Sequence, residues 1–371
     1  MKYPRFLFHG NFIPGNEISK HFLFENPASV VEFRKGDDPA LFFKGLDEAQ
    51  REGLWLAGWI RYGAGSSLDR LPDSGEQGSI ARFYAFPAFS VFQESLLSVV
   101  RQAEFELDTE RGEYLRKVET IRESIIRGDV YQVNLTMRAR FRMDGGPESI
   151  FLNLAAEHPV PWSAAAIDED GSILSMSPEL FFRKRGNLLH FRPMKGTAPR
   201  SSSMVEDLLS RKSLFESEKN RAENLMIVDL IRNDASRICR NVRVSDLFRV
   251  EKYETVYQMT SDVYGDLLPQ VTVGEIFRSV FPSGSVTGAP KYRAMEMIRD
   301  LENSPRGIYT GSLGLISPAG DMAFNVAIRT LDWREGKVEL GIGSGIIYDS
   351  VAKDEYDECL LKACFLSGRG K

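Results

Sequence analysis

The sequence predicts a globular protein in which strands and helices form one large α/β region, with a thinner amino-terminal part packed on it. Three observations support this prediction. The chain has 371 residues, of which 43% are hydrophobic, so it can bury a sizeable core. Short aromatic-rich runs dominate the first hundred residues. Longer helical and strand-like runs follow, without an internal repeat or a low-complexity linker. We therefore expect an amino-terminal region over residues 1–105 and a larger region over 106–371.

The individual elements follow from apolar spacing and turn residues. The runs LWLAGWIRYGAG (54–65) and ARFYAFPAF (81–89) alternate and are rich in aromatic residues, which is typical of strands bounded by Gly and Pro turns. Between 108 and 129, apolar residues recur at a helical period that Gly128 ends, so a helix is expected there. The run VYQVNLTMRARF that follows at once is predicted to be a strand. The helical stripe consists of Tyr114, Leu115, Val118, Ile121, Ile125 and Ile126.

Charge and apolar run lengths disfavour several classes of function. The net charge is −5 and the pI is near 5.7, so nothing global attracts nucleic acid or acidic membrane surfaces. An anionic small substrate would need a local cluster of cations. No apolar run approaches the length of a membrane span or of a signal segment, and the protein is predicted to be cytoplasmic.

The cysteines and histidines do not form a recognisable site. Cys239, Cys359 and Cys364 include no CxxC pair and no metal spacing, which favours reduced, buried thiols and argues against zinc. The histidines lie outside the segments rich in glycine and carboxylates, so the acid and base of an enzyme are expected to be other residues. These histidines are His9, His21, His158 and His190.

One lysine, Lys195, lies between a methionine and a glycine in the stiff, turn-rich segment HFRPMKGTAPR. It follows two apolar strand-like runs joined by the turn RKRGN, and Glu179 lies at the start of the first run. We therefore predict that Glu179 and Lys195 lie on neighbouring strands of one hairpin and face a common cavity. Glu179 is either a carboxylate in solvent at the start of a strand or a general acid, and the local pattern leaves both open.

Two further glutamates lie on predicted helices. Ser217 begins a helix over 217–234 whose second half is apolar on nearly every side, which is typical of a buried helix, and Glu223 enters its buried face. Glu358 lies on a second helix near the carboxyl end, at i, i+4 spacing to Lys362. Each glutamate could form an ion pair with a basic side chain. Alternatively, the two could share a Mg²⁺ ion, which prefers oxygen ligands.

Glycine-rich segments offer places for an anion to bind. FPSGSVTGAPKYRAMEMI sets a turn-rich stretch before a helix, but its spacing of glycine and lysine does not match a Walker A loop, so nucleotide binding is disfavoured. ELGIGSGIIYDS is a predicted strand ending in Gly341, Gly343 and Gly345, where backbone amides could approach a carboxylate or the chain could bend tightly. Arg329 lies among apolar strand residues, where a guanidinium is costly unless it binds a partner such as a carboxylate.

Taken together, these segments closely resemble the chorismate-utilising enzymes. Eight motifs occur in that family's order, and the match covers about 115–368. Anthranilate synthases usually carry a small residue at the place of Lys195. A P-x-KGT loop instead resembles the aminodeoxychorismate synthase component I branch, which begins 4-aminobenzoate and folate synthesis. The motifs are SPELF, RPMKGTAPR, AENLMIVDLIRND, FPSGSVTGAPK, RGIYTGSLG, AIRTL, GIGSG and DEYDECLLKA.

The resemblance implies a fold and a set of roles. The implied fold class is α+β, a two-subdomain α/β sandwich of antiparallel sheets with helices on the outside and the site between the subdomains, as in anthranilate synthase component I. Lys195 would be a covalent nucleophile and Glu179 a general acid in the conversion of chorismate and ammonia to 4-amino-4-deoxychorismate. Glu223 and Glu358 would hold Mg²⁺. The implied substrate-binding residues are Thr197, Tyr309, Arg329, Gly343, Ser344, Gly345, Lys362 and Lys291.

Two positions depart from the family's pattern. Gln258 stands where the family often has a histidine, which weakens any role for an imidazole near the C4 hydroxyl of the substrate. Ser285 replaces a threonine but keeps its hydroxyl. A nucleophilic lysine also needs a lowered pKa, and desolvation together with Mg²⁺, Lys291 or Arg329 could lower it.

Several alternatives stay open at this point. No cysteine lies in a strand-to-helix elbow with a histidine nearby in sequence, so a separate glutamine amidotransferase subunit is expected to supply ammonia. The rival enzymes are anthranilate synthase component I and isochorismate synthase. A rival of another class is a non-catalytic subunit that only docks an amidotransferase. Metal-dependent turnover of chorismate would separate that last alternative from the enzymes.

Overall fold

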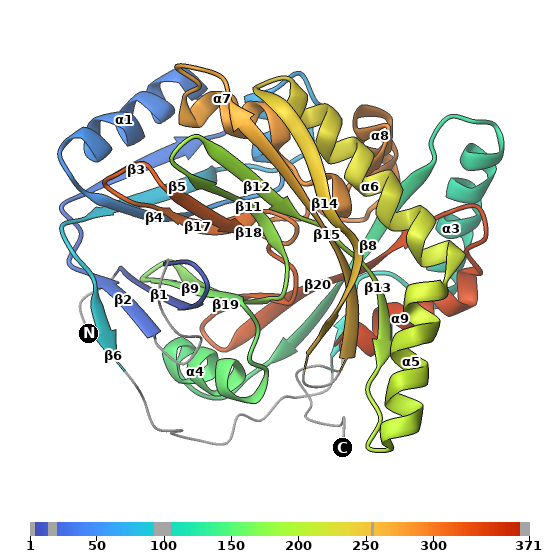
Figure 1. The fold of residues 1–371 in the computed structure, drawn as a ribbon. Coiled ribbons are helices and arrows are strands. Elements are labelled where there is room, and N and C mark those ends of the chain that lie inside the picture. Colours follow the sequence, from blue (N-terminus) through green and yellow to red (C-terminus); the bar gives the residue numbers. More distant parts are fainter. Residues whose placement is uncertain (1–3, 14–20, 93–104, 254–255, 364–371) are drawn as a thin grey trace.

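Two antiparallel sheets lie face to face in this protein, and helices cover their outer faces (Figure 1). The computed structural model describes residues 4–13, 21–92, 105–253 and 256–363. The arrangement of the two sheets and the helices confirms the expected α+β sandwich.

Every strand of the described residues belongs to one of the two sheets. The strands of the first sheet are β1 (Arg5–Gly10), β2 (His21–Glu25), β6 (Ser90–Phe92), β7 (Glu106–Leu107), β8 (Gln132–Arg142), β9 (Trp162–Asp168), β10 (Gly171–Ser177), β16 (Gly288–Ala289), β19 (Thr330–Arg334) and β20 (Lys337–Ile346). The strands of the second sheet are β3 (Ser29–Arg34), β4 (Trp55–Ile60), β5 (Ser79–Phe86), β11 (Leu180–Arg185), β12 (Leu188–Arg192), β13 (Met194–Pro199), β14 (Cys239–Lys252), β15 (Val256–Leu267), β17 (Ser312–Ile316) and β18 (Met322–Asn325). The helices are α1 (Pro39–Arg51), α2 (Ala64–Leu68), α3 (Arg111–Ile126), α4 (Pro147–Glu157), α5 (Met204–Glu216), α6 (Glu218–Ser236), α7 (Val273–Val280), the 3₁₀ turn η1 (Gly284–Val286), α8 (Lys291–Leu301) and α9 (Ala352–Ala363).

The strand order interleaves distant parts of the chain. The first sheet runs β16-β8-β20-β19-β10-β9-β1-β2-β6, and β7 pairs with β8. The second runs β13-β15-β12-β11-β18-β17-β4-β5-β3, and β14 pairs with β15. Strands that precede residue 105 pair directly with later strands in both sheets, β1 with β9 and β4 with β17. The expected amino-terminal region, residues 1–105, thus shares both sheets with the rest of the chain, and its boundary stays a prediction.

Two of the predicted helices form where expected. The helical stripe before Gly128 is α3, and β8 follows it as predicted, although Ile126 is 66% exposed and does not join the core. Ser217 caps α6, and its hydroxyl accepts a hydrogen bond from the backbone N–H of Asn220. The expectation that α6 is buried on nearly every side is wrong, because Leu225 is 43% exposed. One face of α6 packs on the second sheet, and the other faces solvent.

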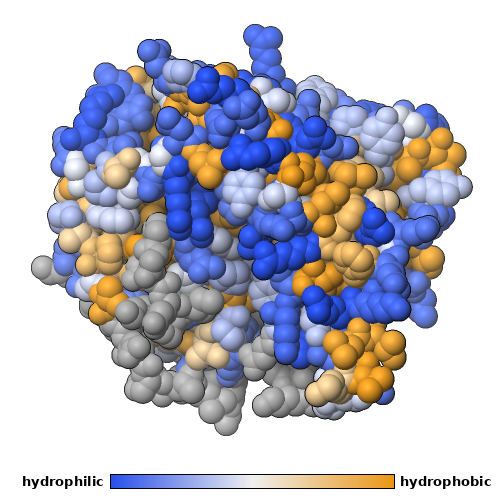
Figure 2. Space-filling view, in the orientation of Figure 1, coloured by the Kyte–Doolittle hydropathy of each residue, from blue (hydrophilic) through white to orange (hydrophobic). Residues whose placement is uncertain are grey.

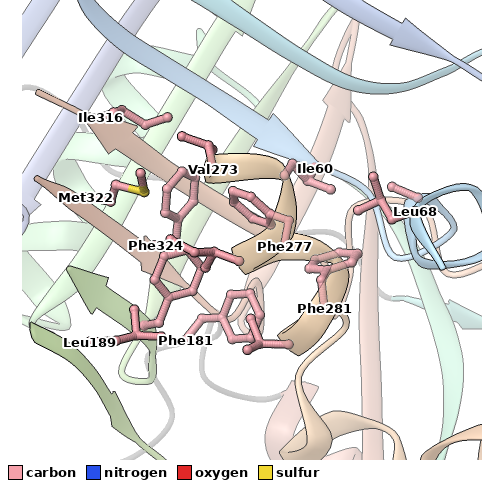
Figure 3. Close-up of a cluster of buried hydrophobic side chains, with 14 of the residues drawn as sticks. Ile60, Leu68, Phe181, Leu189, Val273, Phe277, Phe281, Ile316, Met322 and Phe324 are labelled. Carbon is pink, nitrogen blue, oxygen red and sulfur yellow. The ribbon is translucent and has the colours of Figure 1, made fainter. Parts of the chain in front are cut away.

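The core lies in layers. Aromatic residues from both sheets pack between them, including Phe6, Phe24 and Phe86. On the outer face of the second sheet, Phe277 of α7 packs edge-on against Phe324 of β18, with ring centres 5.0 Å apart (Figure 3). Burying a side chain of this size contributes about 1.5–3 kcal/mol. A capping box that precedes α7 fixes the start of this helix.

The surface is mostly hydrophilic, with apolar side chains gathered over α5 at the lower right of Figure 2. Of the residues of α5, only Leu214 is buried. None of the helices in the described residues is both long enough and apolar enough to cross a lipid bilayer. The exposed apolar side chains of α5 are Met204, Val205, Leu208, Leu209 and Phe215.

Candidate active site

Glu179 lies just before β11 and is only 4% exposed, so its interpretation as a carboxylate in solvent is wrong. Its carboxylate accepts a hydrogen bond of 2.6 Å from the hydroxyl of Ser285 and another from the backbone N–H of Met194. Burial raises the pKa of Glu179 to about 7, although these donors and the nearby Lys195 oppose the rise. A carboxyl group with a pKa near neutrality can act as a general acid.

Lys195 lies on β13, which pairs with β15 and not with β11. The hairpin predicted from the sequence consists of β11 and β12 only, so the expectation that Glu179 and Lys195 lie on its two strands is wrong. The chain leaves the hairpin at Pro193, and the pairing of β13 with β15 shifts register between Met194 and Thr197. The two side chains nevertheless lie close together. The backbone N–H of Met194, the residue before Lys195, donates a hydrogen bond to the carboxylate of Glu179.

The surroundings of Lys195 favour a neutral amine. Burial lowers its pKa, and the ammonium group of Lys362 lowers it further. The carboxylates of Glu223, Glu179 and Glu358 oppose this shift without reversing it. The nearby cation is therefore Lys362 on α9, and not Lys291 or Arg329, the side chains named from the sequence.

The two glutamates expected to hold a metal lie on α6 and α9. Burial raises the pKa of Glu223, and the carboxylates of Glu355 and Glu358 add to this rise, while Lys195 opposes it. Glu358 forms an ion pair with Lys362, one of the two alternatives for this glutamate, at 2.7 Å between side chains that are about half exposed. Among the described residues Glu223 makes no ion pair with a basic side chain within 4.0 Å, so the ion-pair alternative for Glu223 gains no support.

The fit of these residues to a metal rests on their charge and donor type. In the described ranges, no three side chains of His, Cys, Asp and Glu gather closely enough to hold a metal ion alone. Glu223 and Glu358 nevertheless concentrate negative charge beside Lys195, and Glu355 adds to the negative charge near Glu223. Carboxylate oxygen is the donor that Mg²⁺ prefers, and Mg²⁺ commonly takes its remaining ligands from substrate and water. The residues therefore fit a Mg²⁺ ion that is completed in this way.

Two glycines of β20 leave room for two side chains of the site, those of Tyr309 and Lys195. A Cβ on Gly341 would lie 2.0 Å from the ring of Tyr309, and one on Gly345 would lie 3.3 Å from Nζ of Lys195. These glycines lie within the strand, so the tight-bend interpretation is wrong. Among the described strands, only β8 pairs with β20 from Gly341 onward, and the other edge of this stretch has no strand partner there. At Gly343 the carbonyl oxygen accepts a hydrogen bond of 2.8 Å from Lys362.

Ser344 points its side chain to the opposite face of β20. Its hydroxyl lies 3.1 Å from the hydroxyl of Tyr114, which also lies 3.2 Å from the thiol of Cys359. Only the backbone of Ser344 is therefore left for the substrate contact expected at this position. Cys239 and Cys359 are buried, and burial raises the pKa of both thiols, in line with the prediction of buried thiols. Cys364 lies outside the described residues.

Two of the residues expected to bind substrate have other partners. Lys291 donates a hydrogen bond of 2.6 Å to the carboxylate of Asp234 on α6 and another to the carbonyl of Val280. Thr197 accepts a hydrogen bond of 3.2 Å from Gln258, its neighbour across β13 and β15. The structure does not bring the amine of Lys291 into the group formed around Lys195.

Arg329 lies between β18 and β19, in left-handed backbone conformation, and not within a strand as expected. Burial lowers the pKa of its guanidinium, while the phenol of Tyr253 opposes this shift. Across the described residues, no carboxylate lies within 4.0 Å of this guanidinium. A half-buried guanidinium in this situation suits an anionic ligand such as a carboxylate.

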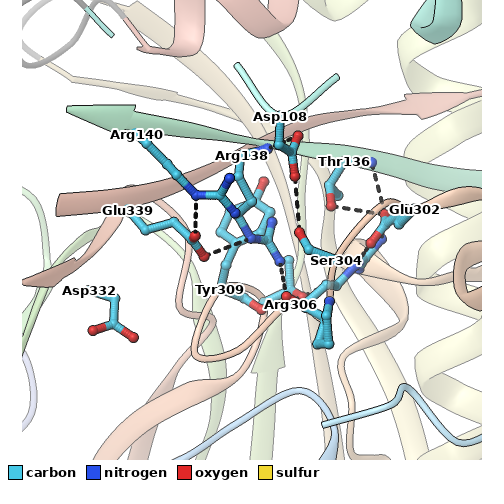
Figure 4. A network of polar contacts seen from close by, with 12 residues as sticks. Asp108, Thr136, Arg138, Arg140, Glu302, Ser304, Arg306, Tyr309, Asp332 and Glu339 are labelled. Carbon is cyan, nitrogen blue, oxygen red and sulfur yellow. Dashed lines mark hydrogen bonds and ion pairs between the residues drawn. The ribbon is translucent and has the colours of Figure 1, made fainter. Parts of the chain in front are cut away.

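Arg138 and Glu339, which were not expected from the sequence, lie near the ring of Tyr309. The guanidinium of Arg138 on β8 lies 5.3 Å from the centre of the Tyr309 ring and 3.2 Å from Glu339 (Figure 4). Burial raises the pKa of Tyr309 to about 12, so its hydroxyl stays a donor at neutral pH. Near Tyr309 in the sequence, Arg306 forms an ion pair with Glu302 at 2.7 Å. The sequence gives no signal that singles out Arg138, because the same strand also holds Arg140 and Arg142.

A groove of about 1260 Å³ opens beside the residues around Lys195 but does not include them. Pro178, the neighbour of Glu179, lines it together with Trp162, Arg192, Phe248 and Tyr253. The groove contains neither Glu179 nor Lys195, so its size does not identify the candidate site. The site is identified by the charged side chains that converge around Lys195.

A family match accounts for this arrangement. The family described as chorismate binding enzyme matches residues 91–368, which is most of the chain. The chain belongs to this family. The resemblance expected from the eight sequence motifs is therefore confirmed, and the converging residues of the candidate site come from those motifs.

Relatives within the family have both amination activities in their names. Aminodeoxychorismate synthase component 1 of Bacillus subtilis is 36% identical over 334 residues, which cover 88% of this chain and 70% of that protein. Anthranilate synthase component 1 of Aquifex aeolicus is 39% identical over 66% of this chain, and the match spans half of that protein's length. The solved structure of anthranilate synthase component I from Streptococcus pneumoniae has a TM-score of 0.83 at 26% identity, covering 97% of this chain and 94% of that one.

Proposed function

We propose that this member of the chorismate-binding enzymes is an aminodeoxychorismate synthase component I, which converts chorismate and ammonia to 4-amino-4-deoxychorismate and water. The observation that carries the proposal is Lys195. Its side chain is partly buried, and its amine has a lowered pKa and lies near Glu179, a carboxyl group whose pKa is about 7. The similarity to the Bacillus subtilis synthase supports the same assignment.

The first chemical step uses Lys195 and Glu179 together. The neutral amine of Lys195 adds to ring carbon C2 of chorismate, the ring double bonds shift, and the bond from C4 to its hydroxyl breaks. Glu179 gives its proton to the departing hydroxyl, which leaves as water. As its new bond forms, the amine of Lys195 gives a proton to the carboxylate that Glu179 has become, and the product of this step is a covalent lysyl adduct of the ring.

In the second step ammonia adds at C4 and loses a proton, while the nitrogen of Lys195 takes up a proton as it leaves from C2, which restores the ring double bonds and the free amine. The guanidinium of Arg329 and the hydroxyl of Tyr309 would bind substrate carboxylates. Glu223 and Glu358 would hold a Mg²⁺ ion. When bound, this ion would neutralise and orient the ring carboxylate of the substrate.

The proposal also covers the source of ammonia and the use of the product. We expect a separate glutamine amidotransferase subunit, because the chain has no cysteine in a strand-to-helix elbow with a histidine nearby in sequence. The product would serve 4-aminobenzoate and folate synthesis in the cytoplasm. The carboxylates and lysines retained around Lys195 argue against a subunit that only docks the amidotransferase.

The rival activity is anthranilate formation, which the Aquifex aeolicus relative carries in its name. Lys195 argues against it, since direct attack of ammonia at C2 needs no amine from the protein. The test is incubation of the purified chain with chorismate, Mg²⁺ and ammonium, followed by identification of the product by mass and chromatography. Aminodeoxychorismate supports the proposal, and anthranilate or isochorismate as the main product contradicts it.

A further inference from the structure

Gln132, the first residue of β8, is fully buried, and among the residues that the structure describes neither polar atom of its side-chain amide has a hydrogen-bond partner. Burying an amide without partners costs free energy, so such a group in a native protein calls for a reason. A structural side chain at this position could be apolar. The amide is therefore suited to a partner that lies in the site itself.

The surroundings of the amide identify this partner. The position that a Cβ on Gly345 would take lies 2.7 Å from Nε2 of Gln132 and 3.3 Å from Nζ of Lys195. The amide and the amine thus share the space that the missing side chain of Gly345 leaves open. They come from different sheets, since β8 and β20 belong to the first sheet and β13 to the second. Gly345 is the residue that lets them approach each other.

From this geometry we propose that Gln132 is a positioning residue for Lys195. A half-turn of the amide exchanges its oxygen and nitrogen, so that the carbonyl oxygen accepts a hydrogen bond from the amine of Lys195. An amine held in this way keeps its lone pair directed away from Gln132. The lone pair is then free for the substrate ring, and the amide N–H of Gln132 is left for an oxygen acceptor.

This role rests on the proposed function for its catalytic consequence, but the contact itself can be tested without it. The variant Gln132→Met has a side chain of similar length without hydrogen-bonding atoms, and Gln132→Leu is a second apolar replacement. Both replace the buried amide by apolar atoms of similar size, so the fold should survive and the melting temperature should stay close to that of the parent. Gln77→Met, at an exposed position, is the matched control.

The contact can be tested by measuring acetylation of Lys195 by acetic anhydride, read from its peptide by mass spectrometry, alongside kcat and KM for chorismate. We expect Gln132→Met to slow acetylation of Lys195 several-fold. We also expect it to lower kcat by roughly 10- to 100-fold, because small misplacements of a reacting group have effects of this size. KM should change by less than about threefold, because the amine and not substrate binding is affected. Gln77→Met should match the parent in all three.

The outcomes separate this inference from the proposed function. Unchanged acetylation and unchanged kcat in Gln132→Met would show that Gln132 only fills space. Unchanged acetylation with a raised KM would mean that Gln132 contacts substrate and not Lys195, which also overturns the inference. A parent protein that makes no aminodeoxychorismate would contradict the proposed function alone, and slower acetylation in Gln132→Met would still support the contact.

Discussion

The hydrogen bond from Ser285 to Glu179 allows the most quantitative prediction. The bond is buried and 2.6 Å long. A hydrogen bond to a charged group contributes about 1.5–3 kcal/mol and a neutral one about 0.5–1.5 kcal/mol. Removal of the Ser285 hydroxyl should therefore disfavour the carboxylate by roughly 1–1.5 kcal/mol more than the acid, and each pKa unit corresponds to about 1.4 kcal/mol. We predict that Ser285→Ala raises the pKa of Glu179 by about one unit.

The assay is the pH dependence of aminodeoxychorismate formation. Glu179 must be protonated to act as the acid, and its pKa is about 7, so turnover should fall as the pH rises through this value. In Ser285→Ala the fall should move up by about one pH unit. Ser285→Thr keeps a hydroxyl and should leave the fall in place. An alkaline limb that stays unmoved in Ser285→Ala would refute the assignment of this limb to Glu179.

Three further predictions concern the metal, the fold and the ammonia source. Glu223→Gln should lose most Mg²⁺-dependent activity while the fold survives. Glu218→Gln, at the exposed start of the same helix, should keep this activity. Equal Mg²⁺ dependence in both variants would mean that Glu223 has a structural role. Gly341→Ala should lower the melting temperature by several degrees, because its Cβ would meet the ring of Tyr309 at 2.0 Å, and an unchanged melting curve would contradict this packing. The isolated chain should turn over ammonium but not glutamine, and glutamine-dependent turnover without a second protein would argue against a separate amidotransferase.

Local signals in the sequence predicted the local structure well. The helical stripe of α3 and the cap at Ser217 depend only on neighbouring residues, and both are present. The ordered motifs led to the family and, through it, to the α+β sandwich. The helix, its cap and the family could all be predicted because none of them requires knowledge of which distant strands pair.

Contacts between distant segments could not be predicted in this way. The sequence placed Glu179 and Lys195 on one hairpin, whereas β15 and β12 separate β13 from β11 in the sheet. Lys291 was expected near the substrate, but its partner Asp234 lies on another helix. Gln132 gave no signal at all, because its importance comes from the space above a glycine of β20, more than two hundred residues later in the chain.

The central claim is that Lys195 forms a covalent bond to the substrate ring. The most direct measurement is mass spectrometry of the protein mixed with chorismate and Mg²⁺ in the absence of ammonia, with the peptide of Lys195 analysed for added mass. We predict an adduct on Lys195 that disappears when ammonium is added, and a Lys195→Ala variant that binds chorismate but forms neither adduct nor normal product. If no adduct can be trapped and Lys195→Ala forms aminodeoxychorismate at nearly the parent's rate, the lysine is structural and the proposed mechanism is wrong.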